Sequence, residues 1–276
     1  MLHIFTVSTG LYNDLFDDNG TNSLNNLFPG YEKIFNVISD SNGLTKRIST
    51  KLNSEFVDVK YFHITNLTYP FVTLHKFDYI VDMCKENNYS SDDFIVYLDA
   101  TSYVIERPHE FWDNIINNHL SKYDICYGIN PYGMDLLSSE LDSRSKYSIT
   151  LEQLTENKED WCQASFMMGT VNGLRLLKNS INQLLLGDIN YTGHWREKMC
   201  ILPNFMEQHY INYVFYSLKH DLPVSNNFTI LGKHYLTPAY IINQGGVAHD
   251  DSFVLCHYEN GLINPKHYGS TYNENL

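Results

Sequence analysis

The chain has 276 residues, of which 43% are hydrophobic and 14% aromatic, which is enough apolar material for one large α/β domain or two small ones. Its formal net charge of -13 argues against nucleic acid and against an anionic membrane surface as partners, because both would repel it. Five widely spaced cysteines without a CxxC pair indicate neither a disulfide framework nor a zinc site, and are typical of reduced thiols in the cytoplasm.

The beginning of the chain reads as a strand. Residues 1–7 lack the basic start and apolar core of a signal peptide, so we expect none. No run approaches about 18 apolar residues, so the sequence also predicts no transmembrane segment. Together with the thiols, these features predict a soluble cytoplasmic protein.

The first 105 residues alternate between predicted strands and helices in the order β-α-β-β-α-β. Short apolar runs rich in strand formers predict strands at residues 2–8, 31–39, 56–64 and 94–98. We expect one helix within residues 13–28 and another beginning near Pro70, with apolar side chains at helical spacing up to Cys84. This order is typical of the nucleotide-binding half of an α/β sheet.

The fourth predicted strand ends abruptly at Asp99. This places a carboxylate at the carboxyl edge of the sheet, where α/β proteins bind ligands. Such a carboxylate can hold a divalent cation shared with a diphosphate, or it can simply cap the next turn. Gly10, in the turn after the first strand, would let a ligand approach the backbone closely.

The second half, residues 106–276, is predicted to supply further strands, helices and a long polar segment. The expected helices lie at residues 110–120 and 174–186 and near residues 205–215, and the expected strands or extended segments at 124–129, 164–168, 234–242 and 253–258. Residues 132–158 are polar and rich in serine, which fits a helical excursion, a lid over a cleft or a solvated insertion.

Two residues of this half have both a functional and a structural interpretation. Glu207 would lie in the first turn of its helix, where a carboxylate also stabilises the helix dipole. His257 ends the last strand, where a histidine can bind a metal or a phosphate but is more commonly a core or surface side chain.

Several short motifs span most of the chain in a fixed order. They are Thr9-Gly10-Leu11-Tyr12, Pro70-x-x-Thr73-Leu74-x-Lys76-Phe77, Tyr97-Leu98-Asp99-Ala100-Thr101, residues 163–170, residues 207–212 and Leu236-Thr237-Pro238-x-Tyr240. In this order they resemble the motifs of family 6 glycosyltransferases. These are retaining α-1,3-galactosyl- and N-acetylgalactosaminyltransferases, and they include the histo-blood-group enzymes and smaller bacterial relatives.

The resemblance implies a GT-A fold, a single Rossmann-like domain that binds a nucleotide sugar and has a mixed central sheet. It also implies a UDP-sugar donor, an oligosaccharide or glycan acceptor, and a set of binding residues. These are Val7, Ser8 and Tyr12 for uracil and ribose, Lys76 and Asp99 for the diphosphate, Gln163 for the acceptor, Met167 and Met168 beside the donor sugar, and Thr9, Ala100, Thr101 and His209 as further binding residues.

The chain departs from the family at the catalytic position and in the Asp99 motif. The family's candidate nucleophile or stabilising glutamate falls on Gln208, and Glu207 takes its place if the register shifts by one. A carboxylate there would stabilise an oxocarbenium-like transition state. Thr101 replaces the second acidic residue of the Asp99 motif. Asp99 is therefore the metal ligand that this motif offers, and both a Mn²⁺- or Mg²⁺-dependent site and a metal-independent site relying on Lys76 fit these residues.

The sequence thus predicts a glycosyltransferase that moves a hexose, galactose or N-acetylgalactosamine, from a UDP-sugar to a glycan hydroxyl with retention of configuration. One alternative is a metal-dependent retaining transferase similar to family 8, using Asp99 and His257. Another is a catalytically weak sugar-binding homologue, which the replacements at Thr101 and Gln208 favour.

Overall fold

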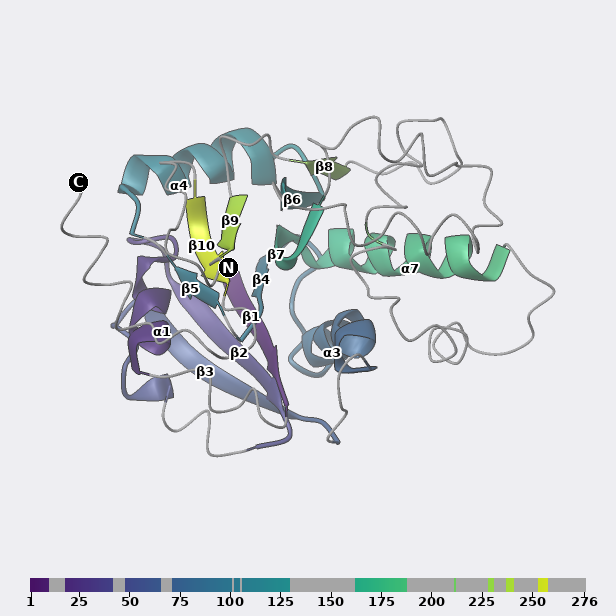
Figure 1. Ribbon diagram of the computed structural model, residues 1–276, viewed down its shortest axis with the longest axis horizontal. Helices are drawn as coiled ribbons and strands as arrows, with labels where there is room; N and C mark the ends of the chain where they lie inside the picture. Colours follow the sequence, from purple (N-terminus) through teal and green to yellow (C-terminus); the bar gives the residue numbers. More distant parts are fainter. Residues whose placement is uncertain are drawn as a thin grey trace.

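The computed structural model describes residues 1–9, 18–41, 48–65, 71–100, 102–104, 106–129, 162–187, 211, 228–230, 237–240 and 253–257. Within these residues a seven-stranded sheet runs between helices, and a three-stranded sheet lies next to it (Figure 1). None of the helices described is both long and apolar enough to cross a membrane.

Four parallel strands form one side of the larger sheet. They are β1 (Leu2–Ser8), β2 (Lys33–Ser39), β3 (Phe56–His63) and β4 (Phe94–Leu98). β1 lies between β2 and β4, and β3 pairs with the other side of β2. The helices between them are α1 (Asp18–Ser23), the short 3-10 helix η2 (Leu24–Asn26) and α3 (Phe71–Glu86). The strands predicted at 2–8 and 94–98 are confirmed, and the other two differ only at their ends.

The other side of the larger sheet comes from the second half of the chain. Its strands are β7 (Cys162–Thr170), β6 (Ile125–Ile129) and β8 (Phe228–Ile230). β7 runs antiparallel to both β4 and β6, so the sheet is mixed, with the order β3-β2-β1-β4-β7-β6-β8. One sheet therefore continues across the predicted boundary at residue 105, and the fold is of the mixed α/β, Rossmann-like type.

The smaller sheet consists of β5 (Ser102–Val104), β10 (Phe253–His257) and β9 (Thr237–Tyr240). Helices in this part of the chain are α4 (His109–Ile115), which continues into the π-helical turn η3 (Ile116–Leu120), and α7 (Val171–Gly187). β5 begins shortly after β4 ends, so the chain passes into the smaller sheet directly after the edge at which Asp99 lies.

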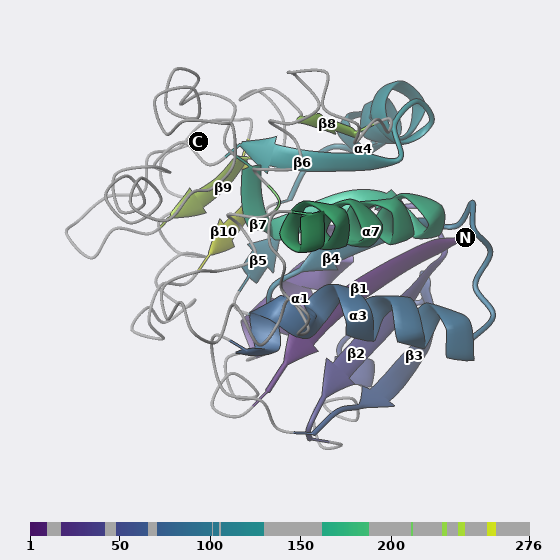
Figure 2. The ribbon, with the colours of Figure 1, turned by 90° about the vertical axis from the view of Figure 1, so that its right-hand side faces the viewer.

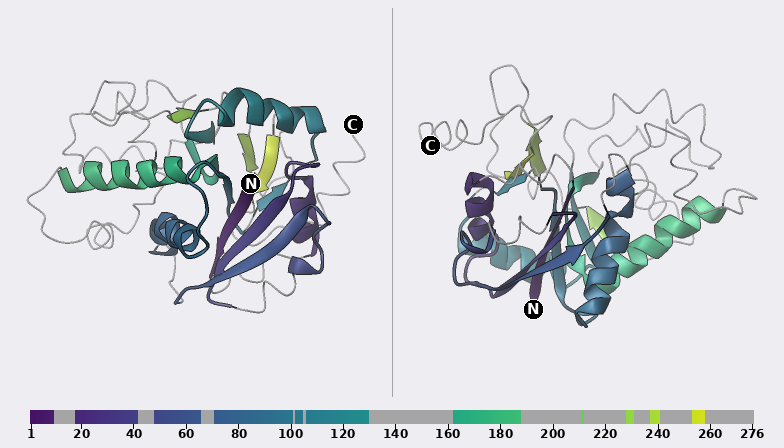
Figure 3. Two further views of the ribbon diagram at one scale, coloured as in Figure 1. Left: turned by 180° about the vertical axis from the view of Figure 1, so that it is seen from behind. Right: turned by 90° about the horizontal axis from the view of Figure 1, so that it is seen from below.

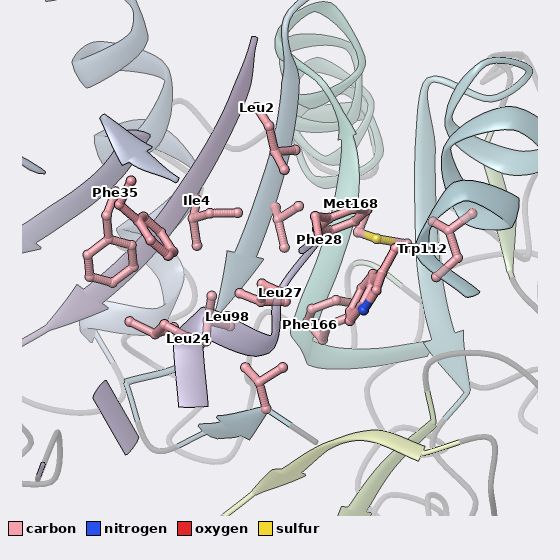
Figure 4. Close-up of a cluster of buried hydrophobic side chains, with 14 of the residues drawn as sticks. Leu2, Ile4, Leu24, Leu27, Phe28, Phe35, Leu98, Trp112, Phe166 and Met168 are labelled. Atoms are coloured by element: carbon pink, nitrogen blue, oxygen red, sulfur yellow. The ribbon is translucent and has the colours of Figure 1, made fainter. Parts of the chain in front are cut away.

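Helices cover both faces of the larger sheet (Figures 2 and 3). Successive strand residues face opposite sides, so each strand contributes to two cores. On one face lies the α3 core, in which Phe5, Ile95, Tyr97 and Met167 pack with side chains of α3 and α7. On the other face lies the α4 core (Figure 4), which joins strand residues to η2, α4 and the turn after η2 through Leu2, Ile4, Leu24, Leu27, Phe28, Phe35, Leu98, Trp112, Phe166 and Met168.

The helix expected within residues 13–28 is present, in the described residues 18–28, as the short helix α1 followed by η2. One strand start differs from the sequence-based expectation for a local reason. β2 begins at Lys33 instead of Tyr31, because the Tyr31 N–H donates to the Phe28 carbonyl across a turn in which Gly30 has a φ of 84°. The predicted lid at 132–158 lies outside the described residues, as does the helix predicted near 205–215 apart from Ile211.

Candidate functional site

The order of the strands singles out one place on the edge of the larger sheet. From β1 the chain moves to β2 and β3 on one side, and then returns to the other side of β1 with β4. The carboxyl ends of β1 and β4 are therefore neighbours at a topological switch point, the usual ligand site of an open α/β sheet. We call the residues there, Ser8 and Thr9 at the end of β1 and Leu98 to Ala100 at the end of β4, the switch-point edge.

Three polar side chains meet on the α3 side of this edge. Tyr97 lies on β4 and Asp99 directly follows the end of this strand, and the Tyr97 hydroxyl donates a hydrogen bond to the Asp99 carboxylate, so both side chains lie on the same side. The Lys76 ammonium of α3 lies 4.5 Å from the centroid of the Tyr97 ring. The Lys76–Tyr97–Asp99 cluster thus joins the two residues expected to face a diphosphate through one tyrosine.

Helix geometry explains why a lysine enters this core. Lys76 precedes Ile80 by four residues, so both lie on the helix face that packs against the sheet. Lys76 is only 1% exposed and Tyr97 3%. Burying an ammonium costs several kcal/mol, and a cation over an aromatic ring recovers about 2 kcal/mol when water is excluded. A hydroxyl that donates to a carboxylate makes its ring more electron-rich, so the two contacts of Tyr97 reinforce each other.

Other residues predicted for the nucleotide lie along the same edge. Val7 is partly buried and packs against the α3 core, while Ser8 and Thr9 are buried at the end of β1. Ala100 is buried in the α4 core. Leu98 pairs with Phe166 of the antiparallel strand β7, so the backbone of Gln163 lies beyond the carboxyl end of β4, on the same side of the sheet edge.

The register places Ser8 in a row with two polar residues, Ser39 and His63, that sequence reasoning did not identify. Ser8 of β1 is level with Ser39 of β2, which in turn is level with His63 of β3. The Tyr61 hydroxyl donates to the Ser39 carbonyl oxygen at 2.8 Å and lies 3.1 Å from Nδ1 of His63. Part of the signal was present in the sequence, because the strands predicted at 2–8 and 31–39 end on Ser8 and Ser39, whereas the strand predicted at 56–64 ends on Ile64.

Met167 and Met168 lie at positions that differ from the expectation. Both are fully buried, Met167 opposite Tyr97 in the α3 core and Met168 opposite Val96 in the α4 core. Adjacent strand residues face opposite sides of a sheet, so these two side chains do not line one pocket together. Their surroundings indicate packing positions in the two cores.

The second sheet brings a distant residue to the switch-point edge. His257, the last residue of β10, pairs in register with Ser102 of β5, three residues after Asp99. His257, one of the two residues predicted for a family 8-like metal site, is thus paired with a residue three positions along the chain from the other, Asp99. A single carboxylate such as Asp99 also fits a Mg²⁺ or Mn²⁺ ion, since these ions commonly take one or two carboxylates and complete their shell with phosphate oxygens and water. Among the described residues, no three His, Cys, Asp or Glu side chains converge.

Glu207, Gln208 and His209 lie outside the described residues, as do Tyr12 and Thr101. Their assigned roles stay predictions.

A second aromatic and polar cluster lies at the opposite, amino edge of the sheet. His3 stacks on Tyr89 with ring centroids 3.7 Å apart, and its Nε2 lies 3.2 Å from Oδ2 of Asp93. The Tyr89 hydroxyl donates to Oδ1 of Asn36 at 2.7 Å. Burial lowers the pKa of His3, although its hydrogen bond to Asp93 opposes this, and burial raises the pKa of Tyr89. Tyr89, like Tyr97, donates a hydrogen bond from a ring packed on the α3 core, so this cluster can serve as a control for the cluster around Tyr97.

Comparison with models of known protein families and with curated proteins found no match to this chain. The function is therefore argued from the switch-point edge and from the motifs in the sequence.

Proposed function

We propose that the switch-point edge binds the diphosphate of a nucleotide sugar and that the chain is a retaining glycosyltransferase with a GT-A fold. In this proposal a hexose, galactose or N-acetylgalactosamine, moves from a UDP-sugar to a hydroxyl of a glycan in the cytoplasm. The observation that carries the proposal is that Lys76 lies over the ring of Tyr97 and Asp99 accepts a hydrogen bond from its hydroxyl, at the point where the strand order reverses.

The chemistry of glycosyl transfer requires the groups found there. The leaving diphosphate is an anion, and its charge must be neutralised as the glycosidic bond breaks. The positive charge of Lys76 can neutralise it directly, or Asp99 can hold a divalent cation that does so. A bound Mn²⁺ or Mg²⁺ would supply electrostatic stabilisation of the leaving group. The acceptor hydroxyl must be held close to the sugar while bulk water is excluded, because hydrolysis competes with transfer.

The pairing of His257 with Ser102 favours a second candidate function, a metal-dependent retaining transferase similar to family 8. Asp99 and His257 would then share the cation. The third reading, a sugar-binding homologue with weak catalysis, depends on Thr101 and Gln208 and predicts donor binding without turnover.

Calorimetric titration of UDP, with Mn²⁺ and with a chelator, tests the proposal. We expect UDP to bind the wild-type chain. Where binding requires Mn²⁺, Asp99→Asn should weaken it about tenfold, because the cation loses its charged ligand. Asp82→Asn is the matched control, since Asp82 lies on the exposed face of α3 and pairs with Lys85 at 3.5 Å.

The two conditions also separate the candidate functions. Binding that requires Mn²⁺ favours a cation on Asp99, whereas equal binding with the chelator favours charge neutralisation by Lys76. If the wild-type chain binds no UDP in either condition, the proposed function is wrong.

A further inference from the structure

We infer that Tyr97 is a positioning residue of the donor site, setting the orientation of the Asp99 carboxylate and the place of the Lys76 ammonium. The inference rests on the proposed function and adds a residue to which neither the motifs nor their chemistry gave a role. Tyr97 is argued to act through its two charged neighbours, with no contact of its own to the donor.

The backbone around Tyr97 holds its ring in one place. Tyr97 is level with Phe5 on β1 and with Met167 on β7, so it stands in the middle of three hydrogen-bonded strands. All three side chains belong to the α3 core, and Tyr97 is 3% exposed. A tyrosine fixed in this way has a hydroxyl whose position is set by the sheet.

That hydroxyl lies at the boundary between the core and the edge. It donates to Asp99, which is only partly buried and follows the last residue of β4. A carboxylate at a strand end would otherwise sample several rotamers, and one strong donor selects among them. Asp99 is therefore held ready for a cation or a polar ligand group.

The aromatic ring of Tyr97 contacts the Lys76 ammonium of α3. Nζ of Lys76 lies 4.5 Å from the Tyr97 centroid and 5.5 Å from that of Phe77. Lys76 lies on helix α3 and Asp99 directly follows strand β4, so the position of one relative to the other depends on the side chain that contacts both. Tyr97 contacts both, so a change in Tyr97 should alter both sides of the diphosphate site.

A double-mutant cycle between Tyr97→Phe and Asp99→Ala tests the first contact. Phenylalanine keeps the ring and removes only the hydroxyl. We expect Tyr97→Phe to weaken UDP binding about tenfold in the wild-type background and to have almost no effect beside Asp99→Ala, because no carboxylate is left to orient. A purely structural role would make the two effects add.

A second cycle, between Tyr97→Leu and Lys76→Met, tests the ring. Leucine removes the aromatic face, so Lys76→Met should weaken UDP binding less in the leucine background than in the wild type. If Tyr97→Leu does not fold, which thermal denaturation will show, the phenylalanine cycle decides alone.

Tyr89→Phe is the matched control. It also removes one hydrogen bond from a tyrosine packed on the α3 core, the bond to Asn36, but at the amino edge of the sheet. We expect it to change UDP affinity by less than about twofold, since it leaves the switch-point edge intact.

The possible failures are distinct. If the wild-type chain does not bind UDP, the proposed function fails and this inference fails with it. The positioning role is overturned, while the donor site stands, if UDP binds but Asp99→Ala or Tyr97→Phe leaves its affinity unchanged. The same holds if the effects of these two substitutions add, or if Tyr89→Phe weakens UDP binding as much as Tyr97→Phe.

Discussion

Two lysines among the described residues are almost completely buried, Lys33 and Lys76, and their surroundings differ. Nζ of Lys33 donates to the carbonyl oxygens of Leu27 and Phe28, at 2.6 and 3.0 Å, and to Oε2 of Glu55 at 2.7 Å. These bonds hold a turn in which Phe28 has a φ of 46°, which is uncommon for a bulky residue. Lys33 therefore stabilises the fold, whereas Lys76 lies at the switch-point edge.

The Lys33–Glu55 pair leads to a prediction for stability. Glu55→Gln should lower the free energy of unfolding by about 2 kcal/mol at neutral pH, because a neutral amide accepts weaker hydrogen bonds from Lys33 and from the Gly30 N–H. Glu32→Gln, an exposed neighbour of Lys33 in sequence, is the control and should change little.

The pH dependence of the same pair has a definite sign. Burial alone would raise the pKa of Glu55, but the hydrogen bonds from Lys33 and Gly30 hold it below its ordinary value of 4.5. A carboxyl with a depressed folded-state pKa stabilises the fold above its unfolded-state pKa, and this stabilisation is lost as the pH falls through the lower folded-state value. Denaturant titrations at neutral and acidic pH should therefore show the difference between wild type and Glu55→Gln shrinking in acid. A difference that stays constant would contradict this account.

At the scale of elements, the start of α7 packs unusually closely on the chain before β6. A Cβ atom added to Gly169 or Gly173 would overlap the Asp124 carbonyl oxygen, which is backbone and cannot move aside cheaply. The Thr170 N–H donates to this same oxygen at 2.9 Å. Close packing against Asp124 therefore explains the glycine of the 163–170 motif, Gly169, which lies at the amino edge of β4, away from Asp99.

The close approach predicts that Gly173→Ala destabilises the protein although alanine favours helices. We expect a loss of about 2–3 kcal/mol in the free energy of unfolding, the usual cost of forcing extra volume into a packed contact. Asn172→Ala is the control, because Asn172 is exposed in the same turn and its backbone bond to Ser91 is kept. If Gly173→Ala is as stable as Asn172→Ala in chemical denaturation, the contact is looser than described.

At the scale of the whole molecule, one sheet connects the predicted nucleotide half with the predicted acceptor half. β4 pairs with β1 on one side and with β7 on the other, and β5 carries the chain from Asp99 into the smaller sheet. A ligand at the switch-point edge would therefore contact a part of the fold that both halves share, and its binding should stabilise the whole chain.

This gives a prediction for thermal unfolding. UDP at about 100 times its Kd, in the condition that supports binding, should add about 2.7 kcal/mol of stability and raise the melting temperature of this 276-residue chain by about 5 °C. The Asp99→Ala variant should show a much smaller shift at the same UDP concentration. An equal shift in both proteins would place the ligand away from Asp99.

The strands at residues 2–8 and 94–98 could be predicted to the residue because short apolar runs end there at polar side chains. The helix predicted within residues 13–28 is present there as α1 and η2, but its bounds could not be read from a segment that is polar with only scattered apolar residues. The row of Ser8, Ser39 and His63 was missed because strand register is a property of paired strands and is not written in any one of them.

The sequence by itself determined the alternation of strands and helices and the position of Asp99 at the end of a buried strand, because these depend on neighbouring residues and on local periodicity. Only the tertiary structure decided that β4 returns beside β1, that Lys76 reaches the ring of Tyr97, and that the strand ending in His257 pairs beside the Asp99 segment. The reason is physical: these contacts join residues far apart in the chain. Their geometry is set by how helices pack on the sheet and how strands choose their partners.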